Sequence, residues 1–216
     1  MIVVDGLRKA YGDTVVLAVD EWTMESGHCV LVGDNGAGKT TLLLILAGLE
    51  APSHGSAKID GHPAGSRAAR AILSFAPDQP ALFDDLTVSD QMTYVARLHG
   101  LDAPHESARE LASALDAERL LDRFPRGMSK GQRQKAGLLV ASARPFDVLL
   151  LDEPTTGLDA PSRAGLLAAL QQLASQGRTI LSSTHDADLI DAADRVVRVA
   201  DGKLRTERSS RTKHEN

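Results

Sequence analysis

The chain has 216 residues, of which 43% are hydrophobic and 25% charged, so it can form one compact domain with a full hydrophobic core. Its formal net charge of −5 argues against a nucleic-acid partner, and its single cysteine, Cys29, excludes an internal disulfide. No apolar stretch approaches the roughly 20 residues of a membrane-spanning helix, and the N-terminal residues lack the apolar core of a secretory signal, so we expect a cytoplasmic protein.

Short runs rich in β-branched residues alternate with helical patterns along the chain. The predicted strands cover residues 2–7, 15–22, 28–33, 71–76, 147–152, 179–184 and 195–200. The predicted helices cover Lys39–Ala47, Ala160–Ser175 and residues 186–193. Such alternation predicts a largely parallel sheet with helices on both faces. The runs "DVLLLD" and "TILSST" are apolar on both faces, so we expect them to be central strands.

Three regions depart from this alternation. Residues 2–30 are rich in strand patterns and poor in helix, which indicates a small antiparallel portion packed on the parallel core. Residues 87–144 carry only helical patterns, so we expect a helical subdomain inserted in the sheet. Residues from about 207 to 216 are polar, and we expect a frayed tail. The prediction is one α/β domain over residues 1–216.

A glycine-rich loop follows the predicted strand 28–33, with the spacing of a phosphate-binding loop. It consists of Gly33, Asp34, Asn35, Gly36, Ala37, Gly38, Lys39, Thr40 and Thr41. The glycines let consecutive N–H groups point at phosphate oxygens, and the helix that follows adds its positive N-terminal end. Lys39 can reach the β- and γ-phosphates of a nucleotide, and the Thr40 hydroxyl can ligate Mg²⁺. An ordinary turn between strand and helix would not explain Gly-Lys-Thr at this position.

Two carboxylates stand at the end of the predicted strand 147–152, where parallel sheets place their binding sites. Asp152 would hold Mg²⁺, directly or through water. Glu153 would point at the γ-phosphate and polarise the attacking water. The alternative is that both acids only open the loop "EPTTG", an interpretation that the nearby glycine-rich loop makes minor.

The stretch "RGMSKGQRQKAGLLVA" is the most informative about the class of nucleotide enzyme. Ser129 is suited to be a helix N-cap, with Gln132 completing a capping box. Gly131, in the first turn, weakens a helix by roughly 1 kcal/mol relative to alanine. A glycine there makes more sense if the phosphate of another molecule approaches the backbone closely.

At this point the chain resembles the ATP-binding cassette family over nearly its whole length, most closely the ATP-binding subunits of bacterial exporters. The resemblance rests on six segments in the family's order: Tyr11, then residues 33–41, 128–132, 149–154, 157–160 and 183–186. "MSKGQ" resembles the family signature LSGGQ, with Met128 for leucine and Lys130 for the first glycine. The resemblance implies that His185 is the switch histidine and that Tyr11 stacks on adenine.

The resemblance further implies a dimer, either of two copies of this chain or with a similar chain. Two ATP molecules would lie at the interface, each reached from the partner chain by Ser129, Lys130, Gly131, Gln132 and Asp159. Asp159 is also suited to be the N-cap of the helix after it. Glu153 and His185 would be catalytic, with Mg²⁺ as the metal.

The work of hydrolysis would pass to a separate integral membrane permease, with this chain on the cytoplasmic face of the membrane and export as the expected direction. The alternative is a soluble cassette ATPase acting on ribosomes or in DNA repair. Those proteins usually carry two cassettes or long coiled coils, and this sequence has neither.

One position departs from the family pattern. The family places a metal-contacting glutamine directly after the proline of "AILSFAPDQP", whereas this chain has Asp78 there and Gln79 one residue later. In one interpretation the loop shifts and Gln79 contacts the metal, while in the other Asp78 faces it through a water. We favour Gln79, because loops flanked by proline accommodate a change of register easily.

Overall fold

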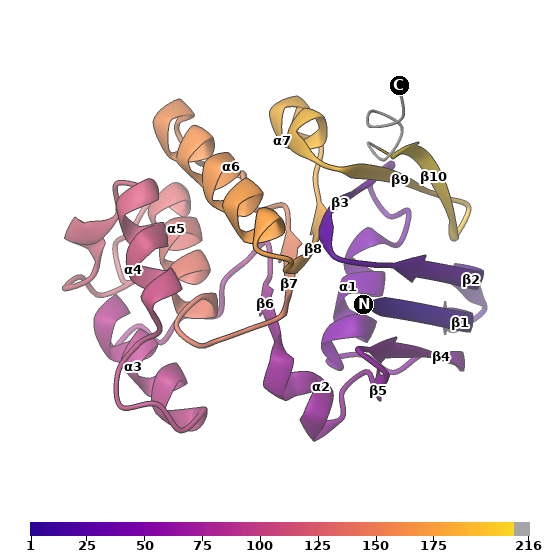
Figure 1. Ribbon diagram of the computed structural model, residues 1–216, viewed down its shortest axis with the longest axis horizontal. Coiled ribbons are helices and arrows are strands. Elements are labelled where there is room, and N and C mark those ends of the chain that lie inside the picture. The colour runs from indigo at the N-terminus through magenta and orange to yellow at the C-terminus, as the bar shows by residue number, and fades with distance from the viewer. Residues whose placement is uncertain (210–216) are drawn as a thin grey trace.

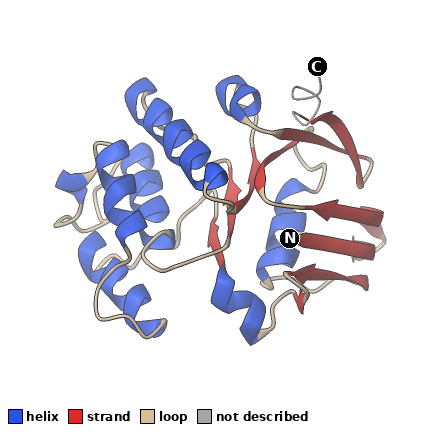
Figure 2. Cartoon of the chain, in the orientation of Figure 1, coloured by secondary structure: helices blue, strands red, loops and turns tan. Residues whose placement is uncertain are grey.

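The computed structural model describes residues 1–209, which form two sheets with helices between and around them (Figures 1 and 2). The strands are β1 (Ile2–Tyr11), β2 (Thr14–Met24), β3 (Gly27–Val32), β4 (His54–Ile59), β5 (His62–Pro63), β6 (Leu73–Ala76), β7 (Val148–Asp152), β8 (Thr179–Ser183), β9 (Arg195–Ala200) and β10 (Lys203–Ser209). The helices are α1 (Lys39–Ala47), α2 (Arg67–Ile72), α3 (Val88–Leu98), α4 (Glu106–Ala114), the 3₁₀ helix η1 (Glu118–Leu120), α5 (Lys130–Ala141), α6 (Ala160–Ser175) and α7 (Ala187–Ala192).

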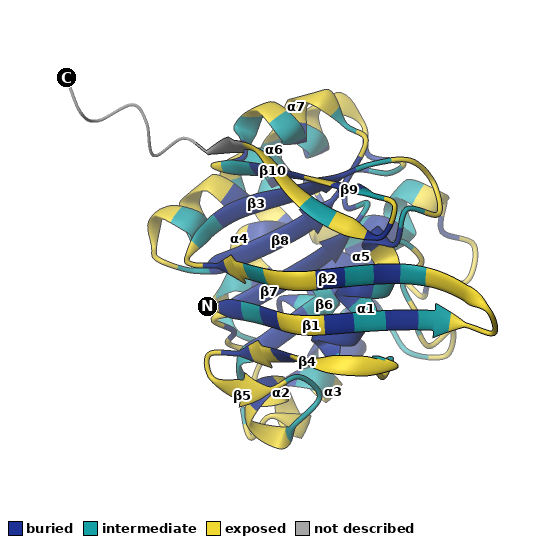
Figure 3. Cartoon of the chain, turned by 90° about the vertical axis from the view of Figure 1, so that its right-hand side faces the viewer, coloured by how far each residue is buried: buried dark blue, intermediate teal, exposed yellow. Residues whose placement is uncertain are grey.

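The larger sheet has six strands in the order β10-β9-β3-β8-β7-β6. Its strands from β9 to β6 pair in parallel, and β10 joins antiparallel to β9. Every residue of β7 and β8 is buried, and Figure 3 shows this sheet as a mostly buried layer. The predicted α/β class, with a mainly parallel core and these two strands inside it, is confirmed.

Successive residues of the parallel strands supply two separate hydrophobic clusters, as the period of two in a strand requires. Leu149 and Leu151 of β7 face a cluster formed with helices α3 to α7. Val148 and Leu150 face the other cluster, which contains α1 and the antiparallel sheet. Helices therefore cover both faces of the sheet, and α1 lies in the cluster that joins the two sheets.

The smaller sheet has the order β2-β1-β4-β5 and is antiparallel throughout. The expectation of an antiparallel portion near the N-terminus is confirmed for β1 and β2. The short strands β4 and β5 were not predicted, because "HGSAKI" is polar and lies at the edge of the core, with only two of its residues buried. The strand that was predicted over residues 71–76 begins two residues later in the structure, at Leu73, since α2 continues to Ile72.

Among the described residues, 88–141 contain helices α3, α4, η1 and α5 and no strand. These helices lie at the end of the molecule opposite the antiparallel sheet (Figure 1). No helix within residues 1–209 is both long enough and apolar enough to cross a membrane.

The expectation of a frayed tail from about residue 207 is wrong for residues 207–209. They belong to β10, which pairs with β9 from Lys203 to Ser209. Backbone pairing at a sheet edge does not need apolar side chains, and Arg198 of β9 forms an ion pair with Glu207 across the strands. The rest of the predicted tail, residues 210–216, lies outside the described part of the chain.

Candidate functional site

The loop between β3 and α1 has a backbone that depends on its glycines. Gly33, Gly36 and Gly38 have φ values of +147°, +81° and +105°. A Cβ on Gly33 would lie 2.2 Å from the carbonyl oxygen of Val199, so no other residue fits there. Gly38 is the N-cap of α1 and has no side chain to bond the first N–H groups of the helix. Those N–H groups are therefore available to an anion.

Lys39 is held across this loop. Lys39 is buried, and its Nζ donates to the carbonyl oxygens of Gly33 at 2.5 Å and Asp34 at 3.1 Å. Nζ also lies 3.3 Å from Nε2 of His185. The ammonium group is thus positioned by neutral atoms, and its charge is free to meet a phosphate.

The two predicted carboxylates follow β7 but have different surroundings. Asp152 is only 4% exposed and accepts a hydrogen bond from the Ser183 hydroxyl of β8. Glu153 has a left-handed φ of +48°, and its N–H donates to the Ser183 carbonyl at 3.1 Å. Such a backbone is uncommon outside glycine and is found where the surrounding structure enforces it. Ser183 therefore fixes both acids, a role that the sequence did not indicate.

Glu153 and His185 approach each other, with Oε1 of the glutamate 3.6 Å from Nε2 of the histidine. Burial raises the pKa of the Glu153 carboxyl above its ordinary value, although the nearby His185 and Lys39 oppose the shift. A carboxylate with a raised pKa is a stronger base, which suits it to accept a proton from water.

A single pocket brings most of the predicted phosphate and metal residues together, although Gly33, Asp34 and Ala37 do not line it. It is lined by Asn35, Gly36, Gly38, Lys39, Thr40, Thr41, Pro77, Asp78, Gln79, Asp152 and Glu153. Thr40 and Asp152 offer a hydroxyl and a carboxylate, the oxygen ligands that Mg²⁺ uses beside waters and substrate phosphates. Among residues 1–209 there is no group of three acidic, histidine or cysteine side chains that could hold a metal without such phosphates.

Asp78 and Gln79 both line this pocket, Asp78 half-buried and Gln79 exposed. Among the described residues, neither side chain has a hydrogen-bond partner that would fix it toward or away from Thr40 and Asp152. Both interpretations of this loop therefore stay as predictions.

The Ser129 segment does not line the pocket. Ser129 caps α5 as predicted: its hydroxyl accepts from the Gln132 N–H at 3.2 Å, and its own N–H donates to Gln132 Oε1 at 3.1 Å. A Cβ on Gly131 would lie 2.1 Å from the carbonyl oxygen of Gly157. The glycine is thus required by a contact within the chain, so a partner's phosphate is not needed to explain it. Lys130 is exposed beside them.

Two further predicted residues lie outside the pocket. Asp159 is the N-cap of α6, as expected, and accepts from the Ser162 N–H at 2.9 Å. That hydrogen bonding to Ser162 lowers the pKa of Asp159. Tyr11 ends β1 with 48% of its surface exposed, and Nζ of Lys9 lies 4.7 Å from the centre of its ring. The side chains of Asp159 and Tyr11 are both exposed, so another molecule can contact them.

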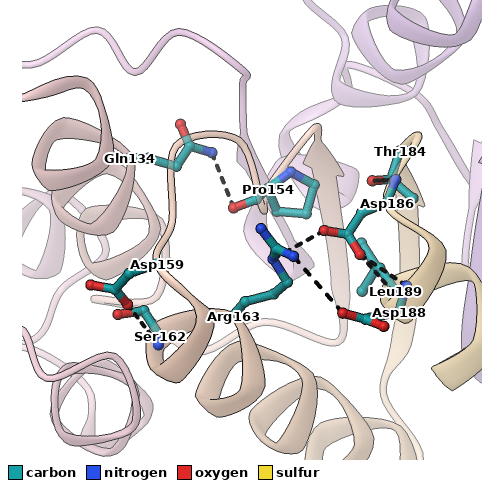
Figure 4. Close-up of polar contacts among 9 residues, drawn as sticks. All are labelled: Gln134, Pro154, Asp159, Ser162, Arg163, Thr184, Asp186, Asp188 and Leu189. Carbon is teal, nitrogen blue, oxygen red and sulfur yellow. Dashed lines mark hydrogen bonds and ion pairs between the residues drawn. The ribbon is translucent and has the colours of Figure 1, made fainter.

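The sequence did not predict a set of polar contacts that joins α5 and α6 to the residues following Glu153 and His185 (Figure 4). Nε2 of Gln134, on α5, donates at 3.5 Å to the carbonyl oxygen of Pro154, the residue that follows Glu153. Arg163, on α6, forms ion pairs with Asp186 and Asp188, which follow His185. No motif in the sequence marks these contacts, because they join residues 20 to 25 positions apart.

Comparison with known proteins places the chain in a family. The family model described as "ABC transporter" matches residues 18–156. The SkfA peptide export ATP-binding protein SkfE of Bacillus subtilis is 33% identical over 205 residues, which cover 93% of this chain and 86% of that protein. The Nod factor export ATP-binding protein I of Burkholderia lata is 36% identical, over 83% of this chain and 60% of that protein.

Another relative, the mouse phospholipid-transporting ATPase ABCA3, is 38% identical over 81% of this chain, which spans only 10% of that protein's length. A solved ATP-binding subunit of an ABC transporter has a TM-score of 0.84 and 28% identity, covering 96% of this chain and 90% of its own. A dimeric bacterial ABC transporter cassette has a TM-score of 0.86 at 24% identity, a likeness that shows the fold. Since the family model matches more than half of its residues, the chain belongs to the ABC transporter family.

Proposed function

We propose that this chain binds and hydrolyses ATP as the energy-supplying subunit of an exporter. The observation that carries the proposal is the pocket in which Lys39, Thr40, Asp152 and Glu153 meet, with His185 beside them. Phosphoryl transfer needs cations around the γ-phosphate, a metal held by a hydroxyl and a carboxylate, and a group that orients water, and these residues supply each part.

In the proposed reaction a water attacks the γ-phosphorus and the bond from that phosphorus to the bridging oxygen breaks, leaving ADP and inorganic phosphate. Glu153 takes the proton of the attacking water, for which its raised pKa suits it. Lys39 and His185 stabilise charge on the γ-phosphoryl oxygens. Thr40 and Asp152 would hold Mg²⁺, which supplies further charge neutralisation on the β- and γ-phosphates when bound.

The site is incomplete in one chain under this proposal. Ser129, Lys130, Gly131 and Gln132 lie outside the pocket, and so do the exposed residues Asp159 and Tyr11. A second chain, identical or similar, would bring its Ser129 segment over the nucleotide. Closure of this dimer would follow ATP binding, and hydrolysis would reopen it.

A groove between the sheet and the helical region supports the proposed membrane permease partner. It is lined by Ala47, Leu49, Arg67, Arg70, Ala71, Leu73, Phe75, Leu98, His99, Gly100 and Arg144. Leu49 and Leu98 are 66% and 65% exposed, and the lining has three arginines and no acid. An apolar segment with acidic side chains on a permease would complement this surface, holding the chain on the cytoplasmic face of the membrane. The direction, export, rests on the named functions of SkfE and the Nod factor protein.

The Glu153→Gln variant tests the chemistry. The amide keeps the shape of the side chain but cannot accept a proton, so ATP should bind, turnover should nearly stop, and a dimer should accumulate in size-exclusion chromatography with ATP and Mg²⁺. Glu118→Gln, at an exposed acid on η1, is the matched control. A Glu153→Gln variant that hydrolyses at the wild-type rate, or stays monomeric with ATP, would refute the role.

Mixing two inactive variants tests the shared site. Lys39→Ala loses the phosphate cation but keeps the Ser129 surface, and Ser129→Arg has the opposite defect. Each should be inactive alone, and the mixture should regain partial ATPase activity. Full activity of either variant alone would show that one chain contains the whole site.

A further inference from the structure

Arg163 joins helix α6 to the segment that carries His185 (Figure 4). Its Nε lies 3.1 Å from Oδ2 of Asp186, and Nη1 lies 3.8 Å from Oδ2 of Asp188. The Asp186 side chain is 13% exposed, while Asp188 is 68% exposed. The ion pair of Arg163 with Asp186 is therefore the more buried of the two, and the ion pair with Asp188 is exposed to solvent.

Asp186 holds the backbone on both sides of itself. Its Oδ1 accepts from the N–H groups of Asp188 at 2.9 Å and Leu189 at 3.3 Å, which makes it the N-cap of α7. Its own N–H donates to the Thr184 hydroxyl at 3.0 Å. His185 lies between Thr184 and Asp186 in the sequence, so the position of its backbone depends on Asp186.

The N-terminal end of α6, which contains Arg163, lies at the surface proposed to meet a partner chain. The helix begins after Asp159, and the carbonyl oxygen of Gly157 is in close contact with Gly131 of α5. Arg163 lies in the first turn, where its N–H donates to the Asp159 carbonyl at 2.9 Å. A movement of residues 157–159 would thus be passed to the backbone of Arg163.

The Arg163 to Asp186 contact is close but does not have hydrogen-bond geometry. Nε is buried, and among the described residues it makes no hydrogen bond. Because Nε belongs to α6 and Oδ2 to the segment after His185, a shift of α6 relative to that segment changes the distance between the two charges. The contact therefore responds to the position of α6.

We propose that Arg163 is a positioning residue, which holds Asp186 and through it places His185 beside Lys39 and Glu153. This inference rests on the proposed ATPase function and adds to it a link inside the chain between the 157–159 loop and His185. Arg163 itself touches neither Lys39 nor Glu153 in the described contacts, so its effect on hydrolysis must pass through the His185 segment.

The test compares Arg163→Gln, which removes the charge, with Arg163→Lys, which keeps it. Arg109→Gln, at an exposed arginine of α4, is the matched control. We expect Arg163→Gln to lower kcat about tenfold and to change the affinity for a fluorescent ATP analogue by less than about twofold, because the phosphate loop is untouched. Arg163→Lys should recover most of kcat, and the melting temperature should change little, since partly exposed ion pairs contribute little stability.

A readout apart from activity follows the position of His185 itself. In the nucleotide-free chain, the NMR signal of the His185 ring should shift in Arg163→Gln and return toward the wild-type position in Arg163→Lys. In Arg109→Gln it should not move. An unshifted ring signal in Arg163→Gln, or a kcat equal to the wild-type value, would overturn the inference. Absence of ATPase activity in the wild-type chain would instead overturn the proposed function, and the ring shift would still decide whether Arg163 positions His185.

Discussion

Replacing Gly131 by alanine separates two reasons for a glycine in the first turn of α5. Its φ is not among the positive values, so alanine suits the backbone, and the effect of the change depends on space alone. An added Cβ would lie 2.1 Å from the carbonyl oxygen of Gly157 and 3.1 Å from its carbonyl carbon. The obstacle is backbone, which cannot turn aside as a flexible side chain can. We therefore expect Gly131→Ala to destabilise the chain without any nucleotide or partner present.

The size of the effect follows from two opposing contributions. Overpacking costs about 1–3 kcal/mol, and a contact as short as 2.1 Å with backbone belongs at the upper end. Alanine returns up to ~1 kcal/mol of helix propensity. The expected net loss is about 2 kcal/mol, or a fall of roughly 4–8 °C in melting temperature for a chain of this size.

Thermal unfolding of the nucleotide-free chain measures this loss. Lys130→Ala, at the exposed neighbour in the same turn, is the control and should change the melting temperature little. If Gly131 served only to admit a partner's phosphate, Gly131→Ala would instead be slightly more stable than the wild type and would lose only ATPase activity. An unchanged or raised melting temperature would therefore refute the contact with Gly157 as the reason for this glycine.

Three further predictions concern other parts of the chain. Gln79→Ala should weaken Mg²⁺-dependent ATPase activity while Asp78→Ala leaves the metal dependence unchanged, and the reverse result in a metal titration would show that Asp78 faces the metal. Burial lowers the pKa of His28 from 6.5 to about 4, so the unfolded chain takes up a proton in that range that the folded chain does not, and about 3 kcal/mol of stability should be lost as the pH falls through it. In urea unfolding, the loss of unfolding free energy as the pH falls from 6.5 to about 4 should be smaller in His28→Gln than in the wild type. An equal loss would exclude His28 as its source. Charge reversal by Arg67→Glu with Arg70→Glu should abolish binding to permease-containing membranes but spare the ATPase activity of the isolated chain, whereas retained membrane binding in a flotation assay would exclude the groove as the docking surface.

The sequence by itself determined the features that depend on local chain geometry. The helix Lys39–Ala47 begins and ends where its pattern predicts, because the residues before and after it, Gly38 and Gly48, have left-handed backbone conformations that favour glycine. β7 and β8 could be identified as inner strands, since a run that is apolar at every position must be covered on both faces. Ser129 and Asp159 were recognisable as caps from the residues that follow them.

Only the tertiary structure decided the features that depend on what packs against a segment. The polar strand β10 exists because β9 offers it an edge, which no pattern in residues 203–209 announces. Gly131 is required because the Gly157 carbonyl lies against it, and Arg163 has a role because α6 places it beside Asp186. Short-range patterns record how a segment bends and which face it buries, whereas these contacts arise from the relative positions of segments that the fold brings together.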